Sequence, residues 1–365
     1  MKKWLARAAL VLIALIVLLI ITLRVRYGGD TVPFPDTSTP PLLPTSAVEV
    51  VATLDEPPGN LAVTRDGRIF FSFHPEARPE RKVAEWVDGK AVAFPSESFD
   101  LFHEVLSLRV DAQGRLWTLD HGFHGFGQPR LLAFDVASRK VVHQWDIPRA
   151  IAPFGSFVQD FQVAPDGAKI YLADVGIVSK RPALIVYDVA AKRGRRVLEC
   201  DPSVTSKPYT LNVKGHEMNL LGGLYKMHLG VDSIALDASG EWLYFGPMAH
   251  ETMFRVRTAD LQNASTKLRV EAFGPKPQSD GIIMDAAGNI YITDVEHGAV
   301  ARLDPNRKLV TLVRDPRFRW LDGFALGPDG SLYVTDSALV EVILRSKSHI
   351  RASGPYFIWR IKLAS

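Results

Sequence analysis

Acidic side chains recur at one position of a repeated sequence pattern. Asp232, Asp280 and Asp322 each lie eight residues before the glycine of an Asp-containing turn, and Asp160 lies one place later in its own copy. Carboxylates that come together require a cation, a proton or intervening water, so this repetition predicts a binding site for a positively charged group. The predicted ligand-binding residues are those at or near this position: Asn60, Glu104, Asp160, Asp232, Asp280 and Asp322.

Three of these acids, Asp232, Asp280 and Asp322, are also candidate metal ligands. Carboxylate oxygens suit Ca²⁺ or Mg²⁺ better than Zn²⁺, so a bound metal is expected to be one of the first two ions. The alternative is structural, with the same acids capping strands and accepting hydrogen bonds from loop amides. A second group of aspartates lies inside the turns themselves and is expected to bond its own backbone: Asp66, Asp111, Asp166, Asp237, Asp285 and Asp329.

Histidines occur in four loops that follow an aromatic strand, in the sequences FHP, DHGFH, PMAHE and DVEHG. Imidazole can act as an acid or a base near neutral pH, so His121, His250 and His297 are candidate catalytic residues. The alternative is that each is a hydrogen-bonded loop residue. The chain has no G-x-S-x-G, phosphate-binding or HExxH motif, which argues against the corresponding hydrolase, nucleotide-binding and zinc-protease classes.

A hairpin that occurs six times must position these residues. Each copy has an apolar strand, a turn with Asp and Gly, and a strand with aromatic residues, as in LAVTRDGRIFFSF from Leu61 and FALGPDGSLYVTD from Phe324. Asp bonds its own backbone in such turns and Gly accepts positive φ. The turn glycines are Gly67, Gly114, Gly167, Gly240, Gly288 and Gly330.

The repeat spacing predicts an all-β, six-bladed β-propeller over residues 48–363. Two further strands follow each hairpin except the last, which has one, and the strand-like residues 48–54 supply the missing partner. Pairing of the two chain ends would then close the ring without an open edge. The long gap before Gly240 predicts an insertion at residues 201–228. Because the first strand of each blade lines the central channel, the recurring acids should face one axis.

The N-terminus predicts a signal anchor. Residues 1–27 contain a basic start, an uncharged apolar run from Ala8 to Leu23 and two further arginines, without a small-x-small cleavage site. The basic excess before the run predicts a cytoplasmic N-terminus and a domain on the periplasmic or extracellular side. Residues 28–47 contain five prolines and are expected to form an extended tether between membrane helix and propeller.

Composition limits the other possibilities. A net charge of +3 from 43 basic and 40 acidic residues argues against nucleic-acid binding, and we expect a monomer. The single cysteine, Cys200, excludes an internal disulfide framework. Because it lies in the strand-like run of residues 196–200 without an adjacent histidine, it is expected to have a packing role.

The sequences GRLWTLDHG, PRLLAFDVASRKVVHQWDIP and LYFGPMAHETMFRV, with their order and blade spacing, resemble the major royal jelly protein and Yellow family. The resemblance implies a six-bladed propeller of a secreted family, in which some members bind biogenic amines in the channel and some are linked to dopachrome conversion. The disulfide-forming cysteines of animal members are absent. A weaker likeness to SMP-30 and gluconolactonase propellers lies in SDGIIMDAAGNIYITD and implies metal binding by Asp280 and Asp232, although the family's first-blade glutamate is replaced by Pro58-Gly59-Asn60.

Three functions fit these patterns. The first is a membrane-anchored propeller that binds a small molecule at an acidic channel mouth. The second is a divalent-metal-dependent lactonase or esterase, in which the ion polarises a carbonyl and a histidine or acid transfers the proton. The third is a protein-interaction platform, which would present a broad apolar patch on one face.

Overall fold

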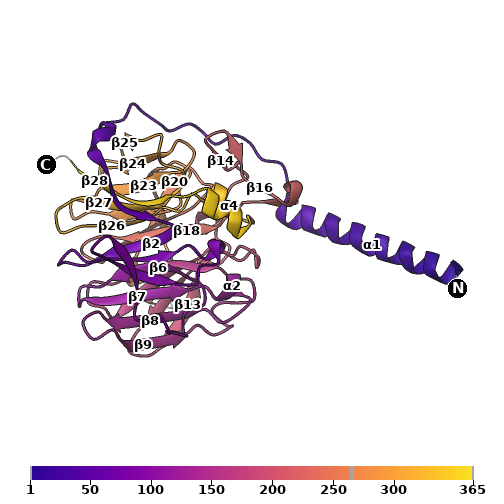
Figure 1. Ribbon diagram of the computed structural model, residues 1–365, viewed down its shortest axis with the longest axis horizontal. Coiled ribbons are helices and arrows are strands. Elements are labelled where there is room, and N and C mark those ends of the chain that lie inside the picture. Colours follow the sequence, from indigo (N-terminus) through magenta and orange to yellow (C-terminus); the bar gives the residue numbers. More distant parts are fainter. Residues whose placement is uncertain (1, 264–266, 364–365) are drawn as a thin grey trace.

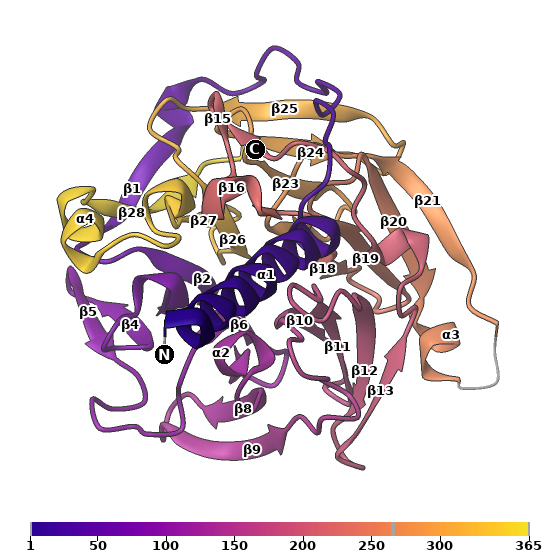
Figure 2. The same cartoon turned by 90° about the vertical axis from the view of Figure 1, so that its right-hand side faces the viewer.

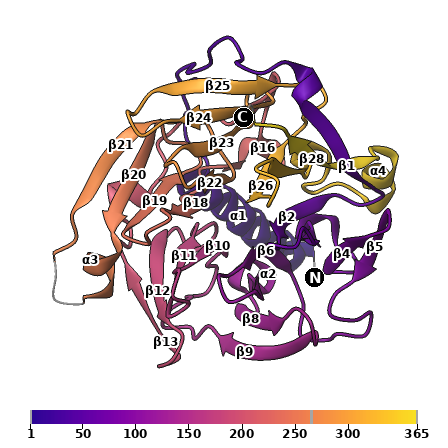
Figure 3. The same cartoon turned by 90° about the vertical axis from the view of Figure 1, so that its left-hand side faces the viewer.

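The computed structural model describes residues 2–263 and 267–363 and confirms the six-bladed β-propeller (Figure 1). Six four-stranded antiparallel sheets surround one axis, as the two views along it show (Figures 2 and 3). Blade one contains β2 (Pro58–Val63), β3 (Ile69–Phe73), β4 (Val83–Val87) and β5 (Lys90–Ala93). Blade two contains β6 (Val105–Val110), β7 (Arg115–Asp120), β8 (Arg130–Asp135) and β9 (Lys140–Asp146).

The next three blades repeat this order of strands. Blade three contains β10 (Val158–Val163), β11 (Lys169–Asp174), β12 (Ala183–Asp188) and β13 (Arg193–Val197). Blade four contains β18 (Val231–Leu236), β19 (Trp242–Pro247), β20 (Thr252–Arg257) and β21 (Val270–Pro275). Blade five contains β22 (Ile282–Met284), β23 (Ile290–Asp294), β24 (Ala299–Leu303) and β25 (Leu309–Arg314).

Blade six joins the two ends of the propeller. Its strands β26 (Leu321–Leu326), β27 (Leu332–Asp336) and β28 (Tyr356–Ile361) are completed by β1 (Val48–Leu54), which pairs antiparallel with β28. The predicted ring closure is therefore confirmed. The six turn glycines all have positive φ, between 70° and 86°, which explains why glycine recurs at the tip of every first hairpin.

The remaining elements lie mostly on one face, the upper face, which carries the loop after the second strand of each blade. These elements include α1 (Lys2–Tyr27), α2 (Gly122–Gly125) and α4 (Lys347–Ala352), and the short strands β14 (Asn212–Val213), β15 (His216–Glu217), β16 (Asn219–Leu220) and β17 (Tyr225–Lys226) (Figures 1 and 2). Outside this set, α3 (Thr258–Gln262) follows β20. Short 3₁₀ helices span Thr45–Ala47, Pro75–Ala77, Pro202–Val204, Leu221–Gly223 and Leu339–Glu341. The strands β14 to β17 fall within residues 201–228, the predicted insertion.

The segment between α1 and the propeller lies along the ring. Leu42 and Leu43 donate backbone hydrogen bonds to Thr311 and Leu312 of β25, at 3.1 and 2.8 Å. Phe34 packs edge-on against Tyr209 of the insertion, with ring centroids 4.9 Å apart. The prolines keep the segment extended, and the Thr39 amide, like those of Leu42 and Leu43, finds its acceptor on the outer edge of blade five.

The expectation for Cys200 was wrong. Strand β13 ends at Val197, Leu198 and Cys200 adopt left-handed backbone, and the thiol is exposed instead of packed. A turn that begins three residues earlier than the strand-like pattern predicts therefore removes Cys200 from the core.

Candidate functional site

The channel residues are placed by irregularities in the inner strands. In β2, β6, β10, β18 and β26 the pairing register with the second strand shifts near the upper end. The shift in β18 lies between Val231 and Ser233, and the shift in β26 lies between Leu321 and Phe324, so Asp232 and Asp322 occupy the bulges. A bulge turns a side chain away from its ordinary alternation, and here it directs carboxylates toward the axis.

Four predicted acids meet in the channel. Asp160, Asp232 and Asp322 are 4, 4 and 5% exposed, whereas Asp280 keeps partial contact with solvent. Burial raises the pKa of Asp232 well above its ordinary value, and the charges of Asp280 and Asp160 raise it further. Burial raises the pKa of Asp280 to about 7. The pKa of Asp322 is likewise raised by burial, followed by the charges of Asp280 and Asp232. These mutual influences show that the four carboxylates share one environment.

Asp160 alone in this set has a strong cationic partner. Arg109, from β6, makes an ion pair with Asp160 at 2.8 Å and also donates to Asn60 Oδ1 at 3.0 Å. Asn60 therefore adjoins the acids through Arg109. Burial raises the pKa of Asp160, and the Arg109 charge opposes this effect.

The other three acids accept mainly neutral donors. Trp320 Nε1 donates to Asp280 Oδ2 at 2.5 Å, and the Gln159 side-chain amide donates to Asp232. His74 Nε2 lies 3.7 Å from Asp322 Oδ2, but burial lowers the pKa of His74 to about 4, so this imidazole is neutral near pH 7.

Lys276 is a buried cation close to Asp232. Its Nζ donates to the carbonyls of Met248 and Pro277 and to Ser279 Oγ, at 3.2, 3.0 and 2.9 Å. Burial lowers the Lys276 pKa to about 7, and the nearby Asp232 charge opposes this effect. Because its hydrogen bonds go to a loop and not to a carboxylate, Lys276 offsets the acidic charge only from a distance.

Glu104 lies apart from the four acids. It precedes β6, and its Oε2 is 3.3 Å from His121 Nδ1 and 4.0 Å from His124 Nδ1. Within residues 2–263 and 267–363, these three side chains form the group of potential metal ligands whose donor atoms all lie within 4.8 Å of one another. The structure therefore gathers potential metal ligands at Glu104 rather than at Asp232, Asp280 and Asp322.

The three predicted catalytic histidines do not meet. Each belongs to a different blade and holds its own loop: His121 Nδ1 accepts from His124 N at 3.1 Å, His250 Nδ1 accepts from Thr252 N at 3.0 Å, and His297 Nδ1 lies 2.9 Å from Asp294. Burial lowers the pKa of His121 well below its ordinary value and that of His250 to about 4. The Asp294 hydrogen bond raises the pKa of His297. The repeated histidine thus has a structural use in each of these loops.

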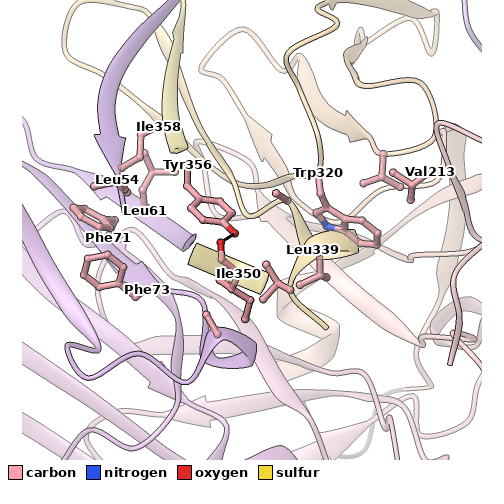
Figure 4. Close-up of a cluster of buried hydrophobic side chains, with 14 of the residues drawn as sticks. Leu54, Leu61, Phe71, Phe73, Val213, Trp320, Leu339, Ile350, Tyr356 and Ile358 are labelled. Carbon is pink, nitrogen blue, oxygen red and sulfur yellow. Dashed lines mark hydrogen bonds between the residues drawn. The ribbon is translucent and has the colours of Figure 1, made fainter. Parts of the chain in front are cut away.

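An apolar layer covers the upper end of the channel. It joins the insertion to the loops of blades four and six in a cluster that includes Val213, Met227, Met248, Trp320 and Leu339. In Figure 4, Trp320 lies between Leu339 and Val213, and the Tyr356 hydroxyl donates to the Ile350 carbonyl farther along the same cluster. A cavity of about 260 Å³ lies at the other end of the channel and is lined by Arg109 together with residues of the inner strands. The acids therefore lie between an apolar cover and this lower cavity.

Sequence patterns missed several residues of the site. Arg109 is the one basic residue of β6, and such a charge in an apolar inner strand is a usable signal. Three other residues near the acids occupy positions that do not recur from blade to blade: Trp320, Gln159 and Lys276. Their proximity to the acids is visible only in the folded ring. Glu76 was also missed, although it follows His74 by two residues; its Oε1 lies 2.8 Å from His124 Nε2.

Known proteins share both the sequence pattern and the fold. The family model described as major royal jelly protein matches residues 104–318. Major royal jelly protein 6 of Apis mellifera is 28% identical over 162 residues, which cover 41% of this chain and 34% of the relative. Major royal jelly protein 3 of the same species is 25% identical over 240 residues, covering 57% and 42%. The matches thus span less than half the length of these relatives.

Solved structures add a likeness of fold. A gluconolactonase from Xanthomonas campestris has a TM-score of 0.55 at 14% identity, covering 92% of this chain and 98% of its own. The calcium-binding protein regucalcin from Agrobacterium tumefaciens has a TM-score of 0.56 at 16% identity, covering 86% and 93%. At such identities the likeness concerns the fold alone. Because the family model matches more than half of the chain, this protein belongs to the major royal jelly protein family.

Proposed function

We propose that this protein is a membrane-anchored propeller that binds a small, positively charged molecule, such as a primary amine, in its central channel. The cation would be held by Asp232, Asp280 and Asp322. The observation that carries the proposal is that these acids influence one another and have neutral close donors, so that burial raises the pKa of each. A ligand cation would balance the negative charge that the acids acquire when they lose these protons, at a place where burial strengthens the attraction.

The surroundings favour an amine that also has an apolar body. Trp320 donates to Asp280 and belongs to the apolar layer above the acids. An ammonium group beside the carboxylates would therefore place its attached carbon atoms against Trp320 and the neighbouring aliphatic side chains. Ligand entry would require displacement of this layer or passage through the lower cavity, since three of the four acids are buried.

Membrane attachment would place the upper face next to the lipid. Helix α1 is long and apolar enough to cross a membrane, and its side chains pack against no core. At its end, Arg24 donates to the Gly223 carbonyl at 2.9 Å and Tyr27 stacks on Tyr225 at 5.6 Å. The orientation follows from the basic residues before the apolar run, and puts the propeller on the periplasmic or extracellular side. Removal of residues 1–27 should release the protein from the membrane fraction.

Calorimetric titration of the full chain in detergent tests the binding proposal. The probes are phenethylamine, tyramine and spermidine, with phenethyl alcohol as the uncharged match for the first, all in the presence of a chelator. At least one amine should bind one-to-one, and Asp280→Asn should weaken it roughly tenfold to a hundredfold. The control, Asp285→Asn, alters a turn aspartate and should leave the affinity unchanged. Equal binding of the alcohol, equal affinities of the two variants, or no binding of any amine would contradict the proposal.

Metal-dependent lactone hydrolysis is the second candidate, favoured by the fold shared with a gluconolactonase and by the channel acids. It requires Ca²⁺ or Mg²⁺ at Asp232, Asp280 and Asp322. Elemental analysis of the purified protein and lactone hydrolysis with and without chelator separate the candidates. A stoichiometric ion and chelator-sensitive turnover, both lost in Asp280→Asn, would favour the hydrolase over the amine-binding protein.

A further inference from the structure

Two glutamates and two histidines form a compact group on the upper face, here called the histidine–glutamate cluster: Glu76, Glu104, His121 and His124. Glu104 precedes β6, His121 follows β7, His124 lies in α2, and Glu76 comes from the corresponding loop of blade one. The donor atoms of Glu104, His121 and His124 lie within 4.8 Å of one another. The cluster joins two neighbouring blades and does not include the channel acids.

Unfavourable backbone geometry places His124 in this cluster. Phe123 and His124 have φ of 53° and 54°, which costs about 1 kcal/mol or more for each non-glycine residue. This turn places the His124 ring next to the His121 ring, with ring centroids 4.9 Å apart. The His124 ring also stacks on Phe157, with centroids 4.8 Å apart. Gly125 is required because a Cβ there would lie 2.2 Å from the Ser156 carbonyl oxygen. Such strain persists where surrounding contacts hold it and is common at functional sites.

Glu104 presents an unsatisfied oxygen to both imidazoles. Its Oε2 is buried and has no hydrogen-bond partner among the residues that the structure describes. Such an atom ordinarily costs about 1–3 kcal/mol, and an ion is one of the few partners that remove this cost. His121 Nδ1, 3.3 Å away, carries a lone pair and not a proton, because it accepts the His124 backbone N–H; a metal bound at this nitrogen would replace that hydrogen bond.

Glu76 contacts the His124 ring on the nitrogen that does not face Glu104. Its Oε1 lies 2.8 Å from His124 Nε2, while the other nitrogen of the same ring faces Glu104. A carboxylate behind a histidine orients the ring and raises the basicity of the nitrogen that binds the metal, an arrangement frequent in metalloproteins.

We propose that Glu104, His121 and His124 bind a divalent transition-metal ion, with zinc as the best match and Glu76 as the supporting carboxylate. Two imidazole nitrogens and one carboxylate oxygen suit zinc and its neighbours, whereas Ca²⁺ and Mg²⁺ prefer oxygen ligands throughout. Three protein ligands leave at least one coordination position for water or another molecule, as in sites that do chemistry rather than purely structural ones. This ion is separate from the cation expected in the channel.

Zinc titration of the metal-stripped full chain in detergent tests this site. One Zn²⁺ should bind per chain, Ca²⁺ should not compete, and Co²⁺ should give the visible absorption of a mixed nitrogen and oxygen ligand set. Glu104→Gln and His124→Ala should each lower the zinc affinity at least tenfold, and Glu76→Gln should lower it roughly tenfold or more. His297→Ala, which alters the equivalent loop of blade five, and Asp280→Asn in the channel are the controls and should bind zinc like the wild type.

Thermal unfolding keeps the test decisive if a variant is unstable. Zinc should raise the Tm of the wild type and of His297→Ala, but not that of Glu104→Gln, which preserves side-chain shape. Absence of a stoichiometric zinc site, equal affinity in wild type and Glu104→Gln, or loss of zinc only in Asp280→Asn would overturn the proposal. Failure of amine binding would leave these outcomes unaffected, because the two sites share no residue.

Discussion

The two ends of the inner strands carry aspartates from the same repeat in opposite surroundings. At the lower end, Asp111 accepts from the amides of Gln113 and Arg115, from the Arg115 guanidinium and from the Trp117 indole, at 2.6 to 3.0 Å. At the upper end, Asp232 is buried near other carboxylates, with a side-chain amide as its close donor. The two sets of aspartates share their residue type and their repeat period. They differ in the hydrogen-bond donors around them, which are numerous for the structural acid and few for the proposed binding acid.

Removal of the Asp111 carboxylate should have the largest effect on stability. Asp111→Ala leaves the buried indole of Trp117 and two turn amides without an acceptor, so we expect the free energy of unfolding to fall by about 4 kcal/mol. Chemical denaturation measures this change. Amine binding by the folded fraction should be retained; a loss of affinity as large as in Asp280→Asn would break the distinction between the two ends.

Arg109→Met should have the next largest effect on stability. It leaves Asp160 buried without its cationic partner, and the free energy of unfolding should fall by about 2 kcal/mol, limited by protonation of the acid. Asp160→Asn in the same background should recover part of this loss. A double-mutant cycle measures the coupling, and additive effects would show that the ion pair contributes nothing.

Asp232→Asn should increase the stability of the ligand-free protein instead of lowering it. The amide removes a buried charge that its neighbours repel but keeps an acceptor for Gln159, so the ligand-free protein should gain about 1 kcal/mol. Thermal unfolding at pH 8 without ligand tests this gain. The same change in the lower turn, Asp285→Asn, should not stabilise the protein; equal behaviour of the two variants would remove the contrast.

The pH dependence of stability should distinguish the wild type from the Asp280→Asn variant. The Asp280 pKa is raised to about 7 in the folded protein, compared with about 3.9 in an unfolded chain. The folded state therefore holds more protons between these values, and stability present below the unfolded pKa is lost as pH rises toward 7. Unfolding of wild type and Asp280→Asn across this range should show a smaller loss in the variant. Parallel profiles would contradict the raised pKa.

The repeated pattern predicts much of the fold because each hairpin repeats the same local chemistry. Aspartate and glycine define the turns, alternating apolar residues define the strands, and residues 48–54 close blade six as their spacing predicts. The equivalent positions of Asp232, Asp280 and Asp322 follow from the same period. The turns and strands are local, so one copy of the pattern contains their physical cause, whereas the closure of blade six joins the two ends of the propeller.

The rest of the site depends on contacts between distant segments. Glu104 joins the histidines because it precedes β6, outside the strand, and the left-handed backbone at His124 completes the group. Arg109 of blade two forms an ion pair with Asp160 of the neighbouring blade three. The insertion covers the acids through apolar contacts that do not recur from blade to blade. Cys200 is exposed because its strand ends early. Periodicity contains no information on any of these contacts.

The central claim is that channel carboxylates give up protons to receive a cation. Calorimetry of amine binding near pH 7, repeated in two buffers with different ionisation enthalpies, measures the protons exchanged per ligand. The wild type should release a substantial fraction of a proton, and the release should fall in Asp280→Asn. Binding without proton release, or an equal release in the variant, would contradict the claim that these acids hold the ligand.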